Sequence, residues 1–355
     1  MSETTVRIAF DGTGLIAWAH ALALRAMADA GVVPARIVSC TDAVGERAQG
    51  FAAVCGCEAI EDPADLFRDA DAVYVCTPTS SHRQWVELAA AAGKAVFCEK
   101  PLATDLAGAE SLAASLRTAG VPAQVGLVLR SIPVFGELVS LVQGGTIGRP
   151  MAAVMRDDQY FPIQGHYSSS WRADVTAAGG GALLEHSIHD VDMLRLLLGP
   201  VQSVSCSTAN FAGHEAIEDS VTALLRMRDG ASVTLASVWH QILSRGSTRR
   251  LEVICEQGMA WLEDDVAGPL MLQTSAGVET RQTPLPAWVR DLPLADDRVG
   301  LAVRSYAMAD RDFVEAVATG SAPHPGVDEA LASHRIVDAL YRSAGSGGAL
   351  VEGPF

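Results

Sequence analysis

Apolar residues in the first third of the chain form short, β-branched runs that alternate with longer stretches of helical periodicity. The short runs predict strands at residues 6–10, 36–41, 72–77, 95–98 and 123–128. The stretches between them predict helices at residues 15–30, 44–54, 81–92 and 106–119. Strands and helices that alternate in this way form a parallel, doubly wound sheet through right-handed crossovers.

The pattern changes after a glycine-rich turn at residues 144–148. Longer strand-like runs follow at residues 151–156, 201–210, 220–227, 232–239 and 250–255, and they predict a mostly antiparallel sheet. Residues 265–300 are rich in Pro, Gly and Asp and predict a loop or arm, and helices are expected at 310–319 and 327–344. We therefore predict an α/β chain with domains at residues 1–125 and 126–355, the second of α+β type.

Composition narrows the class of protein. The 355 residues are 49% hydrophobic, enough for two cores, and the formal net charge is −16 without a lysine-rich run. That charge disfavours binding to nucleic acid or to an anionic membrane surface. The N-terminus lacks a basic region followed by an apolar stretch, and no run reaches the ~18 apolar residues of a membrane span. The expected location is the cytoplasm.

Seven cysteines, an odd number, do not look like a disulfide framework. Five of them lie in apolar, strand-like runs, where cysteine behaves as a small hydrophobic residue: Cys40, Cys76, Cys98, Cys206 and Cys255. The pair in Cys55-Gly56-Cys57 has no second Cys/His pair at finger spacing, which disfavours a metal site there.

A glycine loop, Gly12-Thr13-Gly14-Leu15-Ile16-Ala17, follows the first predicted strand and opens the first predicted helix. Such a loop lets the backbone approach a pyrophosphate, and the helix N-terminus offers unpaired N–H groups to the anion. Asp42, at the end of the second predicted strand, can accept both ribose hydroxyls and would repel a 2′-phosphate. The pair favours NAD over NADP. The alternatives are a loop that is glycine-rich for steric reasons and an aspartate that caps a turn.

Two further segments follow predicted strands at the same carboxyl edge, where open parallel sheets bind ligands. The first is Thr77-Pro78-Thr79-Ser80-Ser81-His82, in which His82 is either a first-turn helix residue or a ligand contact. The second is Glu99-Lys100-Pro101. The chain uses arginine for every basic position except Lys94 and Lys100. The ammonium of Lys100 is suited to hydrogen-bond an oxygen whose charge changes during a reaction. The alternative is that Lys100 is an ordinary surface lysine at the end of a strand.

The segment 179–192 in the second domain carries the densest set of reactive side chains. As a continuous α-helix after three glycines, its spacing places Glu185, His189 and Asp192 on one face. A histidine flanked by carboxylates is suited to act as a general base. One alternative is a structural histidine with acids that match the helix dipole. Another is a metal site with His186, less favoured because His186 points about 60° away on an ideal helix.

These motifs, in this order and spacing, resemble the Gfo/Idh/MocA oxidoreductases, the glucose–fructose oxidoreductase and inositol dehydrogenase family. The resemblance extends to Ser170-Trp171-Arg172, Glu218-Asp219-Ser220 and Tyr341-Arg342-Ser343-Ala344. It implies an N-terminal Rossmann domain that binds NAD, with NADP less favoured, and a C-terminal domain with a large open-faced sheet that forms homodimers or homotetramers. It also implies hydride transfer at a ring carbon of a sugar, inositol or related polyol.

By the same resemblance, Lys100 matches the active-site lysine, His189 the proposed acid/base and Asp192 the acid one turn on. Glu185 stands where many members have Asp, and Asp11 replaces a usually apolar residue. The expected cofactor contacts are Gly12, Thr13, Gly14, Leu15, Ile16, Asp42, Thr77, Pro78, His82, Glu99, Lys100, Trp171 and Arg172. The expected substrate contacts are Lys100, Tyr160, His166, Arg172, Glu185, His186 and His189. Some relatives are ligand sensors or hydrolases that use NAD transiently, and both alternatives stay open.

Overall fold

The computed structural model describes residues 5–265 and 268–355, which form two compact units. The first unit runs to Ala103 and also contains Ala107–Ser131 and Leu285–Leu331. The second contains Thr104–Leu106, Ile132–Pro284 and Ala332–Phe355. The domain boundary predicted from the sequence, between residues 125 and 126, placed 285–331 in the second domain. In the structure this segment belongs to the first unit, because its long helix packs against the first helix of the chain.

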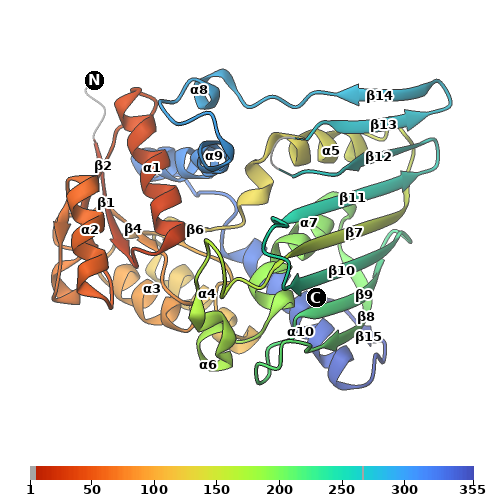
Figure 1. Ribbon diagram of the computed structural model, residues 1–355, viewed down its shortest axis with the longest axis horizontal. Helices are drawn as coiled ribbons and strands as arrows, with labels where there is room; N and C mark the ends of the chain where they lie inside the picture. Colours follow the sequence, from red (N-terminus) through yellow and green to blue (C-terminus); the bar gives the residue numbers. More distant parts are fainter. Residues whose placement is uncertain (1–4, 266–267) are drawn as a thin grey trace. The chain divides into compact units, whose positions relative to one another are not determined.

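The first unit is a six-stranded sheet in the order β3-β2-β1-β4-β5-β6, with every described strand pair parallel. Its strands are β1 (Val6–Asp11), β2 (Ala35–Thr41), β3 (Glu58–Ala59), β4 (Ala72–Val75), β5 (Ala95–Cys98) and β6 (Ala123–Val125). Its α-helices are α1 (Leu15–Asp29), α2 (Gly45–Cys55), α3 (His82–Ala91), α4 (Leu106–Ala119), α8 (Ala287–Arg290) and α9 (Arg298–Thr319). Single 3₁₀ turns lie at Pro63–Asp65, Thr79–Ser81 and Val128–Ser131. The predicted doubly wound sheet is confirmed (Figure 1).

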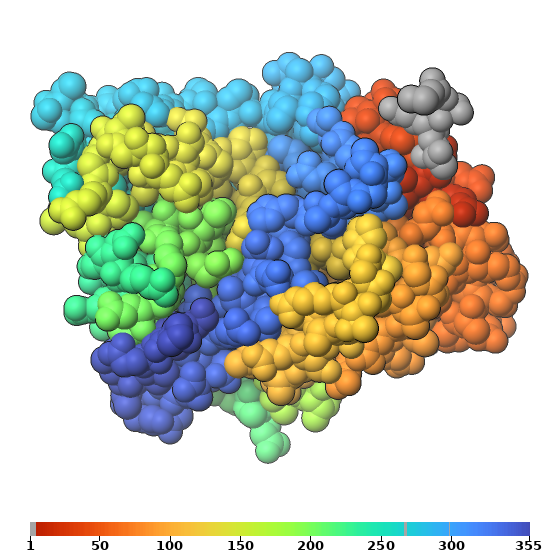
Figure 2. All heavy atoms as spheres, turned by 180° about the vertical axis from the view of Figure 1, so that it is seen from behind, coloured from red at the N-terminus to blue at the C-terminus, as the bar shows by residue number. Residues whose placement is uncertain are grey.

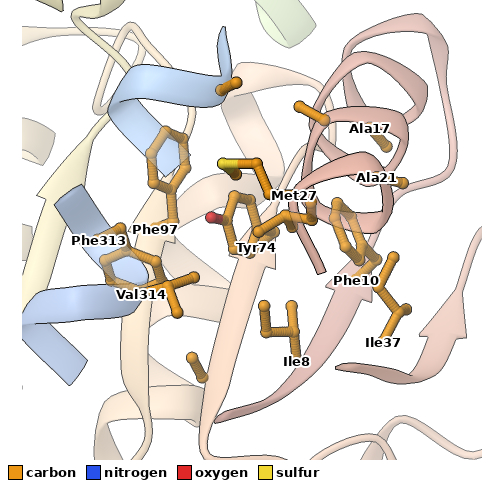
Figure 3. Packing of buried hydrophobic residues seen from close by; sticks show 14 of the residues in the cluster. Ile8, Phe10, Ala17, Ala21, Met27, Ile37, Tyr74, Phe97, Phe313 and Val314 are labelled. Atoms are coloured by element: carbon orange, nitrogen blue, oxygen red, sulfur yellow. The ribbon is translucent and has the colours of Figure 1, made fainter. Parts of the chain in front are cut away.

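Side chains from both faces of this sheet are buried, as its apolar runs predict. Tyr74 of β4 belongs to a core shared with α1, α2 and α9, whereas Val73 and Val75 are fully buried on the opposite face. The rings of Phe10, Tyr74 and Phe97 lie side by side across β1, β4 and β5, with centroids 5.0 and 4.7 Å apart (Figure 3). Each such pair adds about 0.5–1.5 kcal/mol beyond its buried area. This aromatic row therefore holds the three strand ends together.

The second unit is a nine-stranded sheet in the order β14-β13-β12-β11-β7-β10-β9-β8-β15. Only β7 and β10 are parallel among its described strand pairs, so the predicted mostly antiparallel sheet is confirmed. The strands are β7 (Pro150–Tyr160), β8 (Val201–Ala209), β9 (Ser220–Met227), β10 (Ser232–His240), β11 (Thr248–Cys255), β12 (Gly258–Leu262), β13 (Leu270–Thr274), β14 (Gly277–Arg281) and β15 (Val351–Glu352).

Helices cover one face of this sheet. Of these, α5 (Pro133–Gln143) lies against β13 and α7 (Ile188–Leu198) against β7. The unit also contains α6 (Val175–Ala178) and the part of α10 (Val327–Gly345) from Ala332 onwards, with a 3₁₀ turn at Ser170–Ala173 and a π turn at Ala182–His186. In Figure 2, seen from behind, the yellow, green and dark blue segments that hold α5, α7 and the end of α10 are visible on the surface of this unit. Along β9 the residues alternate between buried and exposed, with Leu225 buried and Leu224 59% exposed. One face of the sheet is thus packed and the other is open in this unit.

The loop predicted at 265–300 was wrong in part. Among the described residues, this stretch holds β13, β14, α8 and the start of α9, which begins at Arg298 rather than at 310. All but one of the residues of β14 are exposed, because the strand lies at the sheet edge, so no alternation of apolar residues marks it in the sequence. Asp297 caps α9 by accepting the N–H of Gly300 at 2.8 Å.

All seven cysteines lie in the described part of the chain and are free thiols. Within residues 5–265 and 268–355, no helix combines the length and the apolar character that a membrane span requires.

Candidate active site

Three strand ends of the first unit lie side by side. Asp11, Val75 and Cys98 are in register across β1, β4 and β5. The ladder continues one residue further, since Cys76 N–H donates to the carbonyl of Asp11 at 2.7 Å and Glu99 N–H to that of Val75 at 3.0 Å. The glycine loop, the Thr77 segment and Glu99-Lys100-Pro101 therefore leave the sheet at one edge, as predicted.

The glycine loop fits a bound pyrophosphate. Gly12 has φ +83°, and a Cβ there would lie 2.8 Å from the backbone of Cys76, so only glycine fits. Gly14 begins α1, and a Cβ there would meet nothing within 4 Å. The first N–H groups of α1, from Leu15 and Ile16 onwards, have no capping side chain. A diphosphate requires such open space next to N–H groups that can donate to its oxygens.

Asp42 is tied to the glycine loop. Its Oδ2 accepts the backbone N–H and the hydroxyl of Thr13 at 2.8 and 2.9 Å, and its Oδ1 accepts the N–H of Val44 at 2.9 Å. A carboxylate has about four acceptor sites, so capacity remains for a ribose hydroxyl. The turn-capping alternative and the ribose-binding prediction are thus compatible, since one carboxylate can do both.

Asp11 is buried beneath the loop, with 1% of its surface exposed. Burial raises the pKa of Asp11 well above its usual value, the neighbouring Thr77 side chain opposes that shift, and the charge of Asp42 adds to it. The raised pKa favours the protonated form, which brings no negative charge to the phosphate loop.

His82 joins two of the segments at this edge. Its Nδ1 lies 2.9 Å from the carbonyl oxygen of Pro101 and its Nε2 lies 3.0 Å from that of Thr77. The side chain is buried, with 1% exposed. His82 therefore braces the backbone after β4 against the backbone after β5, and a contact with cofactor stays a prediction.

The carboxylate of Glu99 contacts the backbone of Lys100. Its Oε2 accepts the backbone N–H of Lys100 at 3.3 Å, and its Oε1 lies 3.1 Å from Nε2 of His20 on α1. A Cβ at Gly126 would overlap the Glu99 carboxylate, so that glycine makes room for it. Lys100 itself is half-buried. Our sequence reasoning missed His20, although a histidine within the alanine-rich buried face of α1 is a signal that could have been used.

In the second unit, Glu218 holds the start of the segment that carries His189. Its carboxylate accepts the N–H groups of Gly181 and Leu183 at 2.8 and 2.9 Å and the hydroxyl of Tyr341 at 2.8 Å. A Cβ at Gly181 would overlap the backbone of Glu218, and one at Gly180 would overlap Tyr341. The triple glycine is thus needed for close packing within this unit.

The predicted continuous α-helix through 185, 189 and 192 was wrong in its first turn. Ser187 N–H donates to the carbonyl of Ala182 at 2.8 Å, which closes a π turn, and α7 begins only at Ile188. The bonds from Glu218 fix the backbone where this turn starts. A π turn has more residues per turn than an α-helix, so the ideal α-helical angle between Glu185 and His189 does not apply.

Each predicted catalytic side chain of this unit is almost completely buried. Glu185 is 1% exposed, and its Oε2 lies 3.3 Å from Nε of Arg172, whose guanidinium lies 4.4 Å over the ring of Trp171. Asp192 is 1% exposed and accepts the hydroxyl of Ser333 at 3.2 Å. His189 is 8% exposed. Burial of two acids and a histidine in one helical segment is typical of sites that tune acid–base groups.

His186 belongs to a buried ionic cluster. Its Nε2 lies 2.7 Å from Asp157 and 3.2 Å from the guanidinium of Arg249, which also pairs with Asp190 and Asp265 at 2.8 Å each. Burial raises the pKa of Asp157 to about 6 and that of Asp190 to about 7. A guanidinium this close repels a divalent cation, which disfavours the metal alternative. Arg249 is in phase with the buried residues Leu251 and Val253 of β11. An arginine at an inward-facing position of a strand is a sequence signal that could have indicated this cluster.

Tyr160 and His166 form a second polar pair in the same unit. The hydroxyl of Tyr160 hydrogen-bonds Nδ1 of His166, and the ring of His166 lies 4.0 Å from that of Tyr167. Tyr160 is 4% exposed. Their part in binding substrate stays a prediction.

The six-stranded parallel sheet with a glycine loop after β1 defines a dinucleotide-binding fold of the Rossmann type. Residues 6–127 match the oxidoreductase family model with the NAD-binding Rossmann fold, and residues 135–261 match the GFO/IDH/MocA C-terminal domain. The chain therefore belongs to the GFO/IDH/MocA family of NAD-binding oxidoreductases.

A curated relative covers nearly the whole chain. It is 30% identical to an inositol 2-dehydrogenase of Rhizobium meliloti strain 1021 over 96% of this chain and 97% of that protein. It is 37% identical to a 1,5-anhydro-D-fructose reductase of Ensifer adhaerens over 49% of this chain and 50% of that protein. The structure of levoglucosan dehydrogenase with NADH and levoglucosan has the same fold, with a TM-score of 0.86, 22% identity and 99% and 100% of the chains covered.

Proposed function

We propose that this protein is a dehydrogenase or reductase that transfers a hydride between NAD and a ring carbon of a sugar, inositol or related polyol. The observation that carries the proposal is the support of Lys100 by buried Glu99 beside a glycine loop that fits a diphosphate. Similarity to an inositol 2-dehydrogenase over 96% of the chain supports the substrate class.

In the oxidising direction the substrate loses a proton from a hydroxyl group and a hydride from the carbon that bears it. NAD, when bound, supplies the hydride acceptor. His189 removes the hydroxyl proton, and Lys100 donates a hydrogen bond to the same oxygen and stabilises the negative charge that develops on it. Glu185 and Asp192 favour the charged imidazolium of His189 electrostatically.

Other polar side chains bind the remaining hydroxyl groups of the substrate in this proposal. They are Tyr160, His166, Arg172 and His186, all in the second unit. The contacts of His186 with Asp157 and Arg249 fix the orientation of its ring for this role. Trp171 contributes to cofactor binding together with Arg172.

The proposed function is tested by a screen of cyclitols and sugars with NAD that follows the absorbance of reduced nicotinamide. We expect turnover with at least one ring polyol. Binding of NAD and a polyol without any absorbance change would instead indicate a sensor. Release of an aglycone from a glycoside without net NADH would indicate a hydrolase.

Asp42→Asn is expected to raise the KM for NAD by about tenfold and to lower the KM for NADP, because the variant removes a charged acceptor and the repulsion of a 2′-phosphate. Steady-state kinetics with both cofactors measure the change. Asp29→Asn, which removes an exposed acid at the end of α1, is the matched control for net charge. An unchanged cofactor preference in Asp42→Asn would contradict ribose binding by Asp42.

We also propose that the open face of the second unit's sheet joins subunits into a homodimer or homotetramer. Val154, Thr234 and Leu224 are in register across β7, β10 and β9, and Val154 and Leu224 are 43% and 59% exposed. Exposed apolar side chains such as these two, on one face of a sheet, are typical of a protein–protein interface.

Leu224→Asp is expected to produce monomers, because it replaces an exposed apolar side chain of this face by a charge. Light scattering coupled to size-exclusion chromatography measures the mass. Leu243→Asp makes the same change at a leucine that is 56% exposed outside the strands, and it should keep the wild-type mass. A monomeric wild-type protein, or a Leu224→Asp oligomer, would contradict this interface.

Seven free thiols fit a reducing compartment. We propose the cytoplasm as the location of the protein.

A further inference from the structure

We propose that His20 of α1 and Asp310 of α9 are positioning residues, which hold the Glu99 carboxylate and through it the backbone from which the Lys100 side chain extends. The inference rests on the proposed function of Lys100, and it assigns two residues far from Lys100 in the sequence to the same reaction. Glu99, His20 and Asp310 all lie in the first unit.

The three side chains form a continuous buried chain. Nδ1 of His20 lies 2.6 Å from Oδ1 of Asp310, and Nε2 of His20 lies 3.1 Å from Oε1 of Glu99. His20 and Asp310 are 0% exposed and Glu99 is 7% exposed. The other oxygen of Glu99 accepts the N–H of Lys100 at 3.3 Å. One unbroken path of hydrogen bonds thus joins α9, α1 and the residue proposed to hold the substrate oxygen.

With both acids ionised, the path requires a doubly protonated imidazole. A neutral histidine has one N–H and can donate to one carboxylate only. Burial alone would lower the pKa of His20, but the charge and hydrogen bond of Asp310, together with those of Glu99, raise it to about 10. At neutral pH both ring nitrogens therefore carry a proton, and His20 donates to both acids.

Aromatic rings leave His20 no alternative position. Its ring centroid lies 5.3 Å from Tyr74, 4.8 Å from Phe97 and 5.1 Å from Tyr306. The hydroxyl of Tyr74 also donates to Oδ1 of Asp310 at 3.2 Å. Figure 3 shows Tyr74 and Phe97 next to each other in this core. The row that joins β1, β4 and β5 thus also fixes the imidazole.

Stability alone does not account for this arrangement. Replacing a buried ion cluster by well-packed apolar residues of similar volume is often neutral or stabilising. The cluster is placed where one carboxylate meets the backbone of Lys100, and a shift of about 1 Å in a catalytic group costs on the order of 100-fold in rate. Precise placement of Lys100 is a reason to keep three buried ionisable groups.

Two variants of His20 separate positioning from bulk stability, because both remove the imidazolium. In His20→Asn the amide reaches only the position of Nδ1, next to Asp310. In His20→Gln the amide reaches the position of Nε2 and can donate to Glu99. We expect kcat to fall about 30-fold or more in His20→Asn and by less than about fivefold in His20→Gln, with the KM for NAD unchanged in both.

The control for stability is Gln124→Met. Gln124 is 1% exposed and donates to the carbonyl of Ala309 on α9 at 3.0 Å, so this variant removes a buried hydrogen bond to the same helix. It should lower the melting temperature and leave kcat per folded molecule as in the wild type. Equal kcat in His20→Asn and wild type, or equal losses in both His20 variants, would overturn the inference.

Lys100→Met distinguishes this inference from the proposed function. If Lys100→Met keeps turnover, the proposed role of Lys100 itself fails. If Lys100→Met loses turnover while His20→Asn keeps it, the role of Lys100 stands and only the positioning by His20 and Asp310 is wrong.

Discussion

Lys100→Arg is expected to lower kcat by about 100-fold, the equivalent of roughly 3 kcal/mol, although the variant keeps the positive charge. A guanidinium is planar and longer than an ammonium, so it cannot place one compact donor at the same point. The affinity for NAD should stay within about threefold, because the glycine loop and Asp42 are the main contacts that we propose for the cofactor. Stopped-flow turnover and a fluorescence titration with NADH measure the two quantities separately.

The chain provides its own control for this substitution. Lys94 is the other lysine, and it lies in the turn between α3 and β5, where its N–H donates to the carbonyl of Ala89 at 2.9 Å. Lys94→Arg makes the same chemical change and should leave kcat as it is in the wild type. Turnover of Lys100→Arg near that of Lys94→Arg would count against any role of Lys100 in the reaction.

His189→Asn is expected to lower kcat for oxidation by about 1,000-fold at neutral pH, within the range of ~10²–10⁴ that a positioned base contributes. Asparagine cannot take up a proton, so the hydroxyl proton has to leave without a base. The rate of the variant should therefore rise steadily with pH, while that of the wild type levels off above the pKa of its base. Initial rates between pH 6 and 10 would show the difference.

His324→Asn is the matched control for this variant, since His324 has a side chain that is 65% exposed and lies in the first unit. Its pH–rate profile should overlay that of the wild type. If His189→Asn keeps the plateau of the wild-type profile, another group is the base, and the proposed role of His189 is wrong.

The parts of the fold that were predictable share a simple physical cause. The strands around Val73 and Phe97 are apolar on both faces because helices cover both faces, and this makes them visible in the sequence. Thr77 and Glu99, the first polar residues after these two strands, then mark the edge where ligands bind. Gly12 was predictable from its place in the glycine loop after the first strand, and the structure requires a glycine there because a Cβ would meet the backbone after β4.

Other parts depend on contacts that local patterns do not encode. His20 and Asp310 are 290 residues apart in the sequence, and nothing near either of them indicates that α9 returns to the first unit. The π turn before His189 depends on the carboxylate of Glu218, 37 residues away from Gly181. The ionic cluster of His186 draws on β7, α7, β11 and the turn after β12. The hydrophobic periodicity of a sequence does not indicate such long-range partners, whereas a three-dimensional structure shows them directly.

The central claim is that Lys100 and His189 act on one oxygen of a ring polyol. A crystal structure of the protein with NADH and a polyol that the screen identifies tests it most directly. We predict a single substrate oxygen within about 2.6–3.2 Å of both the Lys100 ammonium and a ring nitrogen of His189. Electron density that places the two nitrogens on different substrate atoms, or leaves either one out of reach of the substrate, would contradict the claim.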